Sequence, residues 1–392
     1  RVVPMLPEHL CNGICSLRPN EEKLAFSCIF EMDDNAKVIK HKIARTVIES
    51  NRRFTYEEAQ AIIESGEGDF ATEMLKLNEL AKILRVKRFA KGAIAFDRVE
   101  VRFEIDEKGK PLSVYFKEAK EANKLIEEFM LLANKTVAAH IGKPKGVKGA
   151  KAKPKTFVYR VHDVPNPDKL ENFSTFIKRF GYKLKTTGKN QEVSSAINNL
   201  LDQVVGKREQ NLIETLAIRS MAKATYTTEN IGHYGLAFDY YTHFTSPIRR
   251  YPDLMVHRLL TRYLSGGRSV MKAKCEENCE HCSHMEQLAE QAERASIKYK
   301  QVEYMADRMG QVYDAVISGV TEWGLYAEIV ENKCEGMIPI RSLAGDYFEF
   351  DEKNYRIVGR KTKRTYRLGD PVRVQVSKCN LERKQMDYEL VE

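Results

Sequence analysis

The spacing of apolar residues predicts a β-hairpin and then helices at the start of the chain. Residues 24–30 and 37–49 are rich in strand-forming side chains and flank the polar turn EMDDNA. From Thr55 the apolar period becomes helical, with Thr55 at the N-cap and acidic residues in the first turn. That helix ends in SGEGD, and a second is predicted over about residues 70–89.

Further segments extend this mixed pattern to about residue 308. The stretch VEVRFEIDEKGKPLSVYF alternates around a turn that contains glycine, which predicts another hairpin. Residues 142–155 hold lysines, prolines and no acid, so we expect a mobile loop that either contacts nucleic acid or is simply solvated. The other predicted elements are a helix over 117–140, a strand over 156–163, and helices near 167–180, 191–206, 208–224 and 283–308.

After residue 311 the pattern changes to short strands separated by turn residues. Five such strands in about 80 residues predict a small barrel of the OB type. The fold class is therefore expected to be α+β, with one large domain over residues 1–308 and a five-stranded barrel over 309–392. The strands are expected in QVYDAVISGV, EWGLYAEIV, EGMIPI, DPVRVQVSKCN and KQMDYELV.

Composition places the chain among ordinary globular proteins. It has 392 residues, 43% of them hydrophobic and 30% charged, and no apolar run approaches the roughly 18 residues of a membrane span. Eight cysteines are too few for a disulfide scaffold, which favours a reducing, cytoplasmic setting. The net charge of +9 indicates a polyanionic partner. The opening Arg-Val-Val-Pro is interpreted as the start of a fragment or of a processed product.

Two rings predict a binding face on the barrel. Trp323 and Tyr326 flank Gly324, which is expected to form a bulge that turns both rings outward. Together with the basic stretch 356–367 they predict a stacking and phosphate-binding surface for single-stranded nucleic acid. The alternative is that one ring belongs to the core and the basic stretch is a solvated loop.

A second candidate site lies in the segment THFTSPIRRYPDL. Ser246 as N-cap and Pro247 in the first turn predict a helix that runs to about Leu264. Its free N–H groups and positive dipole end favour an anion. Arg249 and Arg250 are expected in the same turn, where a planar guanidinium matches phosphate oxygens.

Two residues further along that helix are predicted to hold Arg249 in place. Asp253 and His257 follow Arg249 at four and eight residues, which places them on one helix face. The alternative is a capped surface helix with an internal ion pair.

Several long stretches resemble the ribonuclease II / ribonuclease R family. HYGLAFDYYTHFTSPIRRYPDLMVHRLL is similar to the signature of its catalytic RNB domain, and RVVPMLPEHLCNGICSLRPNEEKLAFSC and AIAFDRVEVRFEID are similar to two other blocks. GVTEWGLYAEIVENKCEGMIPIRSL and YRLGDPVRVQV resemble the S1-type RNA-binding OB domain. The resemblance implies processive hydrolysis of single-stranded and structured RNA from its 3′ end to nucleoside 5′-monophosphates, with Mg²⁺.

The resemblance also implies roles for single residues. Arg249 matches the arginine that contacts the scissile phosphate, and Phe96 matches the ring that stacks on the 3′-terminal bases. Tyr56 and Glu127 match positions near the terminal nucleotides that help to favour ribose over deoxyribose. Glu293 matches a glutamate that lines the active-site cavity. Without the resemblance, each would be taken for an ordinary core or surface residue.

The family's metal ligands are not found in the sequence. The resemblance implies a two-metal mechanism with an Asp-rich motif upstream of the first residue, so we expect no metal ligands here and a chain that is inactive alone. Either the chain is a truncated form or another chain supplies the missing part. Asp33 and Asp34 form the only Asp pair and are interpreted as a hairpin turn.

Other functions remain as alternatives. The chain could be a non-catalytic RNA-binding module, which would use only its basic surfaces. A weaker alternative is a zinc-stabilised adaptor, because Cys275, Cys279, Cys282, His281 and His284 have spacings that zinc sites favour. The expected partners are RNA 3′ ends and other RNA-decay proteins, with no membrane.

Overall fold

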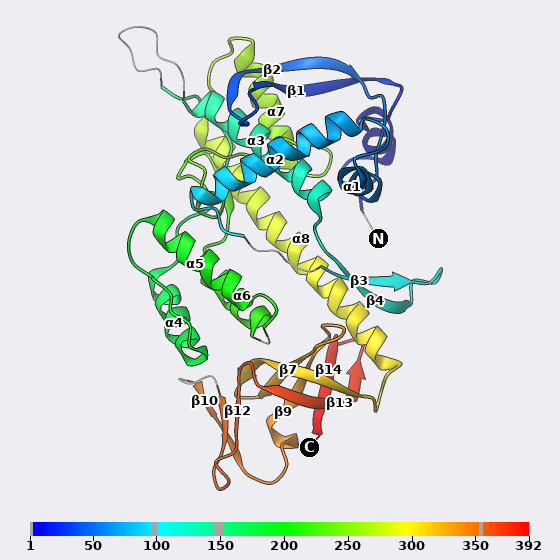
Figure 1. Ribbon diagram of the computed structural model, residues 1–392, viewed down its shortest axis with the longest axis vertical. Coiled ribbons are helices and arrows are strands. Elements are labelled where there is room, and N and C mark those ends of the chain that lie inside the picture. The colour runs from blue at the N-terminus through cyan, green and yellow to red at the C-terminus, as the bar shows by residue number, and fades with distance from the viewer. Residues whose placement is uncertain (1–2, 96–99, 144–152, 208, 353–355, 392) are drawn as a thin grey trace. The chain divides into compact units, whose positions relative to one another are not determined.

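The computed structural model describes residues 3–95, 100–143, 153–207, 209–352 and 356–391. It divides into two compact units, and both mix helices with strands, so the predicted α+β class is confirmed (Figure 1). The predicted boundary near residue 309 stays a prediction. The first unit comprises Arg1–Phe96, Ala119–Leu200 and Arg219–Glu286, and the second comprises Asp97–Glu118, Leu201–Ile218 and Gln287–Glu392. Phe96 and most of the lysine-rich stretch 142–155 lie outside the described residues.

A long antiparallel hairpin and three helices open the first unit, as the sequence predicts. The Asp pair forms the hairpin turn: the Asp33 carboxylate accepts hydrogen bonds from the backbone N–H groups of Asn35 and Lys37, at 3.0 and 2.8 Å. This confirms the turn interpretation of the pair. The elements are β1 (Glu22–Met32), β2 (Val38–Glu49), α1 (Tyr56–Ser65), α2 (Ala71–Ala90) and α3 (Glu121–Gly142).

Helix α1 begins and ends where its local sequence predicts. Thr55 Oγ1 accepts from the Glu58 N–H at 3.1 Å, and the Glu58 carboxylate accepts from the Thr55 N–H at 2.8 Å. This reciprocal pair is a capping box, which satisfies two otherwise unpaired backbone donors. Gly66 ends the helix with a φ of 75°, a conformation that glycine adopts without strain.

The rest of the first unit packs around α3 and α7 (Figure 1). Val137, Ala138, Val256 and Leu260 are fully buried in its largest hydrophobic cluster. The further elements are η1 (His9–Ile14), β5 (Tyr159–Val161), α4 (Pro167–Ile177), η2 (Lys178–Phe180), α5 (Asn190–Val204), β6 (Thr225–Thr227), η3 (Tyr234–Leu236), α7 (Tyr251–Leu264) and α8 (Lys272–Ala306), of which α5 and α8 continue into the second unit.

Helix α8 begins earlier than predicted and takes in the cysteine-rich stretch. Cys275, Cys279 and Cys282 pack into the hydrophobic cluster of the first unit, whereas His281 and His284 are exposed. Within the described ranges, no group of three or more His, Cys, Asp or Glu side chains is placed to hold a metal ion. Core packing therefore accounts for the three thiols without zinc.

The second unit contains the closed barrel that the alternating pattern predicts. Its strands follow the order β13-β14-β9-β8-β7, with β9 and β14 parallel and the other pairs antiparallel. On β8, Leu325, Ala327 and Ile329 are fully buried. The strands are β7 (Val312–Thr321), β8 (Gly324–Ile329), β9 (Glu335–Pro339), β13 (Pro371–Asn380) and β14 (Gln385–Val391), and η4 (Ile340–Ser342) follows β9.

The basic stretch 356–367 forms two strands joined by an exposed connection over residues 360–364, so only its middle is a solvated loop. Two of its segments are strands of a three-stranded antiparallel sheet, β10 (Phe348–Asp351), β11 (Arg356–Gly359) and β12 (Thr365–Arg367). Ile357 pairs with Tyr366, and both side chains are buried in the hydrophobic cluster of the barrel. Apolar residues between the cations therefore anchor this sheet.

A hairpin and a helix complete the second unit. The predicted hairpin is present as β3 (Glu100–Ile105) and β4 (Pro111–Lys117), and α6 spans Gln210–Ser220. The Phe103 ring lies 6.1 Å from the Tyr304 ring near the end of α8, and Lys110 pairs with Asp307 at 2.7 Å. No helix in the described part of the chain has the length and apolar character needed to cross a membrane.

Candidate functional site

Helix α7 begins at Tyr251, so the predicted start at Ser246 is wrong. The Ser246 carbonyl accepts hydrogen bonds from the backbone N–H groups of Arg249 and Arg250, at 3.3 and 3.0 Å, which closes a turn ahead of the helix. Pro252 occupies the first helical turn instead of Pro247, because a proline there loses no intrahelical hydrogen bond. Both arginines therefore precede α7, although its end at Leu264 is as predicted.

The buried carboxylate of Asp253 holds this turn, but through Arg250 and not Arg249. Asp253 is 0% exposed and accepts from the Ser246 N–H at 2.7 Å and from Arg250 Nη2 at 2.9 Å. The predicted support of Arg249 by Asp253 is thus wrong. His257 does not support Arg249 either, because its Nε2 bonds the carbonyl of Phe244 at 2.8 Å. The geometry fixes Arg250 and leaves Arg249 exposed to solvent.

Several buried polar atoms of this turn have no partner among the described residues. They are Thr245 Oγ1, Arg250 Nε and Asp253 Oδ2. A buried donor or acceptor without a hydrogen bond costs about 1–3 kcal/mol. Polar atoms left unpaired in one turn indicate a place where a polar ligand or another segment completes the hydrogen bonding.

The aromatic and imidazole rings of the loop before this turn pack on one another inside the first unit. The Tyr241 ring lies 5.2 Å from His233 and 5.6 Å from His243, and Tyr226 Oη bonds His243 Nδ1 at 2.7 Å. Burial, aided by the charges of Arg250 and other cations, lowers the pKa of His243 to about 2. Burial likewise lowers the pKa of His233 to about 3. Both imidazoles are therefore neutral at physiological pH and act as a scaffold.

Helix α3 anchors this loop through one side chain. Asn134 Nδ2 donates to Tyr241 Oη at 3.2 Å, and Asn134 Oδ1 accepts from the Phe244 N–H at 2.9 Å. A buried amide that bonds two points of a loop sets its course relative to the helix. Sequence reasoning missed Asn134, since an asparagine inside a helix gives no local signal of its partners.

The remaining predicted site residues are spread over the structure. Tyr56 is exposed at the first position of α1, and Glu127 is exposed on α3, where it pairs with Arg88 at 3.4 Å. Glu293 is exposed on the part of α8 that belongs to the second unit. Phe96 lies outside the described residues, so its predicted stacking role is untested.

On the barrel, Trp323 and Tyr326 differ in exposure. Trp323 lies in the turn between β7 and β8 and is 70% exposed, whereas Tyr326 is partly buried against Gly319. The bulge predicted at Gly324 is wrong, because the register shift lies on β7 between Ile317 and Gly319. Gly324 is required for another reason: a Cβ there would lie 2.1 Å from the carbonyl oxygen of Ile338.

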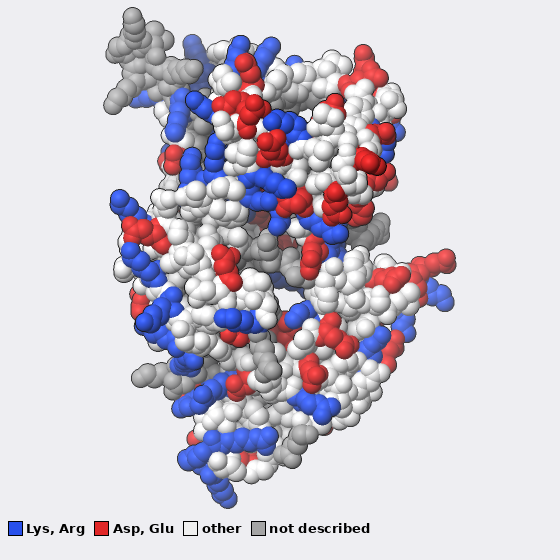
Figure 2. All heavy atoms as spheres, in the orientation of Figure 1, with Lys and Arg blue, Asp and Glu red and all other residues white. Residues whose placement is uncertain are grey.

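On the adjacent sheet, arginines lie over the exposed Tyr347 ring and over the Tyr366 ring, which is buried. The Arg360 guanidinium lies 4.7 Å from the Tyr347 ring centroid, and Tyr347 is 66% exposed. Arg364 lies 5.3 Å from the Tyr366 ring. In Figure 2, Lys and Arg side chains gather at the lower end of the view, where Figure 1 draws β10 and β12. An exposed ring such as Tyr347 beside a guanidinium group is suited to bind single-stranded nucleic acid by stacking and charge.

The fold defines a protein with an OB-type barrel after a larger α+β part. The RNB domain matches residues 1–266, and the S1 RNA binding domain matches residues 307–390. The chain therefore belongs to the RNB domain family. The family resemblance seen in the sequence is confirmed.

Curated relatives match along the whole chain. Ribonuclease R of Aquifex aeolicus is 38% identical over 100% of this chain and 55% of its own length. Ribonuclease R 1 of Lactococcus lactis is 37% identical over 99% of this chain and 48% of its own length. The chain thus spans about half the length of the curated relatives it matches.

Solved structures show the same fold. The apo form of Mycoplasma genitalium RNase R superposes with a TM-score of 0.90 at 26% identity, over 100% of this chain and 61% of that one. The same values hold for that enzyme in complex with ribose-methylated single-stranded RNA. Yeast Ssd1, described as a pseudonuclease, shares the fold with a TM-score of 0.68 at 22% identity, over 91% of this chain and 44% of that one.

Proposed function

We propose that this chain works in the processive, hydrolytic degradation of RNA from its 3′ end, with nucleoside 5′-monophosphates as products. The observation that supports this most is the match to ribonucleases R along the entire chain. The neighbour of known structure that binds single-stranded RNA supports RNA as the ligand. The expected substrates are single-stranded and structured RNA with a free 3′ end.

In this proposal Arg249 contacts the scissile phosphate. Its exposed guanidinium extends from a turn that the buried Asp253 holds through Arg250, so the turn is rigid while Arg249 stays available. A planar guanidinium matches phosphate oxygens and binds the charge that develops in the transition state. The unpaired Arg250 Nε and Thr245 Oγ1 are donors that a phosphate oxygen would satisfy.

Other contacts follow from the resemblance. Phe96 stacks on the 3′-terminal bases, while Tyr56 and Glu127 lie near the terminal nucleotides and favour ribose. Glu293 lines the active-site cavity. On the barrel, Trp323 supplies the exposed stacking ring and Tyr326 a partly buried one.

The resemblance implies Mg²⁺ and a two-metal mechanism, but the described residues do not fit a metal site. No group of three or more possible ligands comes together among them, and one carboxylate oxygen of Asp253 already bonds Arg250 and the Ser246 N–H. We therefore derive no step through a metal from these residues. The proposal assigns Mg²⁺ to the Asp-rich motif that the resemblance implies upstream.

A second candidate function is RNA binding without cleavage. The exposed Trp323 of the barrel, and the Arg360 guanidinium beside the exposed Tyr347 ring, would serve RNA binding without any cleavage chemistry. Both candidate functions predict that the chain binds RNA, and only the first predicts that RNA is degraded.

A degradation assay separates the two candidates. Single-stranded RNA labelled at its 5′ end is incubated with Mg²⁺ and either this chain or a form extended upstream through the Asp-rich motif. We expect both forms to bind RNA, and only the extended form to shorten it stepwise from the 3′ end. RNA bound by every form but never shortened would support the non-catalytic candidate, whereas cleavage by the 392-residue chain would contradict our assignment of the metal ligands.

The role of Arg249 is tested in the extended form. Arg249→Ala should depress turnover far more than binding, because one phosphate contact among many adds little affinity but acts on the transition state. Arg258→Ala is the matched control, since Arg258 is an exposed arginine of α7, the helix that follows the turn. Equal turnover of the two variants would refute the assignment.

The barrel surface is tested by RNA affinity at two salt concentrations. Trp323→Ala should weaken binding of single-stranded RNA by about 1–3 kcal/mol, the value of one stacked base. Tyr299→Ala, which removes an exposed ring from α8, should leave affinity near that of the wild type. Binding should also weaken as salt rises, because phosphate contacts release counterions. Unchanged affinity of the Trp323 variant would exclude this face as the binding platform.

A further inference from the structure

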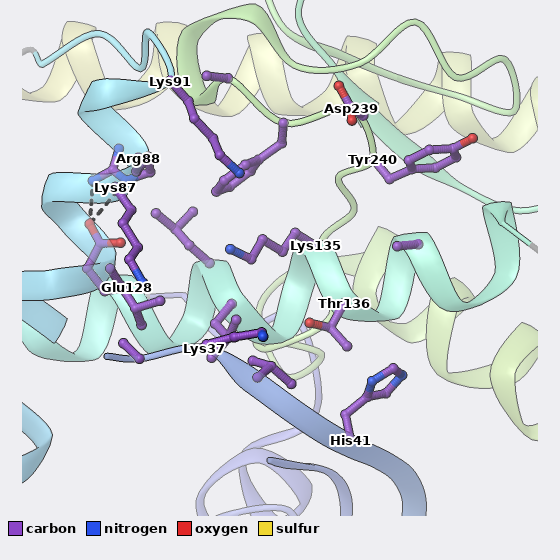
Figure 3. Close-up of a pocket in the computed structure, with 18 of the residues that line it drawn as sticks. Lys37, His41, Lys87, Arg88, Lys91, Glu128, Lys135, Thr136, Asp239 and Tyr240 are labelled. Atoms are coloured by element: carbon purple, nitrogen blue, oxygen red, sulfur yellow. Dashed lines mark hydrogen bonds and ion pairs between the residues drawn. The ribbon is translucent and has the colours of Figure 1, made fainter. Parts of the chain in front are cut away.

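The first unit contains a large cavity whose lining does not include the turn of Arg249. Its volume is about 1230 Å³, which is somewhat above the usual range of small-ligand pockets, roughly 300–1,000 Å³. The turn of the first hairpin, helices α2 and α3, and residues 237–240 enclose it (Figure 3). Its lining includes six cationic side chains, Lys37, Lys87, Arg88, Lys91, Lys135 and Lys143, and only two carboxylates, Glu128 and Asp239.

Both carboxylates already have a cationic partner. Glu128 is buried and pairs with Arg88 at 2.6 Å, with a second contact from Arg88 Nε at 3.1 Å. Asp239 lies 3.9 Å from Lys143 at the opposite side of the cavity. Within each pair the two charges cancel, so the excess positive charge of the cavity comes from the remaining lysines.

Two of these lysines extend into the cavity without an anionic partner. In Figure 3, Lys91 from the end of α2 and Lys135 from α3 point their ammonium groups into the space between the elements. Neither forms an ion pair with a carboxylate among the described residues. Burial, followed by the nearby charge of Lys91, lowers the pKa of Lys135. Lys91 is exposed and Lys135 is partly buried, and two ammonium groups that repel each other gain free energy when an anion binds between them.

Rings and apolar side chains form the rest of the wall. The Lys135 ammonium lies 5.1 Å from the Phe238 ring, and Lys143 lies 4.8 Å from the Tyr240 ring. Tyr240 packs against Gly142, where a Cβ would approach the ring to 2.5 Å, so its position is set by close packing. Ala237 has a φ of +53°, an uncommon conformation for a residue with a side chain. Strain of this kind gathers at ligand sites.

We propose that this cavity binds a free nucleoside 5′-monophosphate, with its phosphate between Lys91 and Lys135 and its base against Phe238 and Tyr240. A terminal phosphate carries a charge of about −1.5 to −2 at pH 7, which matches two unpaired ammonium groups. An internal phosphodiester of RNA carries a single charge and matches them less well. The aromatic wall adds base stacking, which every nucleobase provides.

The lining of this site does not include Arg249, although Arg88 of the lining also pairs with Glu127, which is proposed to lie near the terminal nucleotides of the RNA. Asn134 of α3 bonds the loop that leads to Arg249, whereas the neighbouring Lys135 points into the cavity. Nucleotide binding here does not rest on the proposed function and would persist in a chain that never cleaves RNA.

Calorimetric titration of the purified chain with 5′-AMP tests the proposal. Lys91→Gln and Lys135→Gln should each weaken AMP binding by about tenfold or more, since a hydrogen bond to a charged group contributes about 1.5–3 kcal/mol. Lys82→Gln on α2 is the matched control, because Lys82 is exposed and does not line the cavity. Lys135→Gln removes a charge that Lys91 repels, so the thermal unfolding midpoint of this variant should not fall below that of the wild type. Adenosine, which lacks the phosphate, should bind far more weakly than AMP.

Several outcomes would overturn the proposal. The first is that AMP does not bind the chain at millimolar concentration. The second is that AMP and adenosine bind with equal affinity, and the third is that both lysine variants bind AMP as tightly as the wild type. Loss of AMP binding in Arg249→Ala would place the nucleotide at the turn before α7 instead of in the cavity. A competition experiment uses a single-stranded RNA without a terminal phosphate. If this RNA displaces AMP from the wild type, and its affinity for the lysine variants falls as much as that of AMP, the cavity binds a polynucleotide.

Discussion

Replacing Asp253 should release the turn that carries Arg249. This carboxylate is fully buried and accepts hydrogen bonds from the Ser246 N–H at 2.7 Å and from Arg250 Nη2 at 2.9 Å. Asp253→Asn keeps the shape of the side chain and one acceptor oxygen but removes the charge. The Arg250 guanidinium then lacks a counterion in a largely buried position.

The size of the effect follows from these two contacts. A hydrogen bond to a charged group contributes about 1.5–3 kcal/mol, and loss of one partner of a buried ion pair costs about 3–5 kcal/mol. Arg250 keeps 21% of its side-chain surface exposed, so water compensates part of the lost charge. We expect Asp253→Asn to lower the free energy of unfolding by about 2–3 kcal/mol, and Asp253→Ala by about 3–5 kcal/mol.

The assay must report on the first unit. The only Trp of the chain is Trp323 in the barrel, so its fluorescence follows the second unit. Hydrogen exchange of peptides spanning residues 244–264, measured with increasing urea, reports on the turn and on α7. The second unit serves as an internal reference, because its exchange should not change.

Two comparisons make the prediction refutable. Asp168→Asn removes an exposed acid from the first turn of α4 and should cost only about 0.3–1 kcal/mol through the helix dipole. In a double-mutant cycle with Arg250→Met, the loss of unfolding free energy in the double variant should be about 1–3 kcal/mol smaller than the sum of the losses in the two single variants. If Asp253→Asn costs no more than Asp168→Asn, or if the cycle is additive, the carboxylate does not hold the turn.

Three further predictions concern stability. Thr55→Ala removes half of the capping box and should cost about 1 kcal/mol, measured as faster hydrogen exchange in α1. Gly324→Ala places a Cβ 2.1 Å from the Ile338 carbonyl oxygen, and the barrel of this variant should unfold at lower urea by Trp fluorescence. Gly310→Ala is the control, since its φ is also positive but its Cβ would meet nothing within 4 Å. The pKa of His243 is lowered to about 2 in the folded state, so below the unfolded value of about 6.5 only the unfolded state takes up a proton. The free energy of unfolding should therefore fall as pH drops from about 6.5, by up to about 1.4 kcal/mol per pH unit, and urea midpoints of His243→Gln should show a shallower slope.

The sequence by itself determined the elements whose signals are local. The barrel strands were predictable because inward and outward side chains alternate, and Leu325, Ala327 and Ile329 are buried as that alternation requires. The α1 start was predictable because both partners of its capping box lie within four residues. The family was also predictable, since its signature stretches are long and continuous in the chain.

Only the tertiary structure decided where α7 begins. Two local signals compete, Ser246 with Pro247 and Arg250 with Pro252, and Ser246 is by itself the stronger N-cap. The buried Asp253 carboxylate selects the later start, because it bonds the Ser246 N–H and Arg250 from inside the helix. Burial and the direction of a side chain depend on the packing of distant elements, which no local pattern contains.

The cavity of the first unit was likewise hidden from sequence reasoning. Lys91 and Lys135 resemble any other surface lysines in a chain that contains 64 lysines and arginines. Packing of α2 against α3 brings them to one cavity, while Glu128 is already paired with Arg88. The charge of a residue is a property of the sequence, but whether that charge has a partner is set by distances between segments that are far apart in the chain.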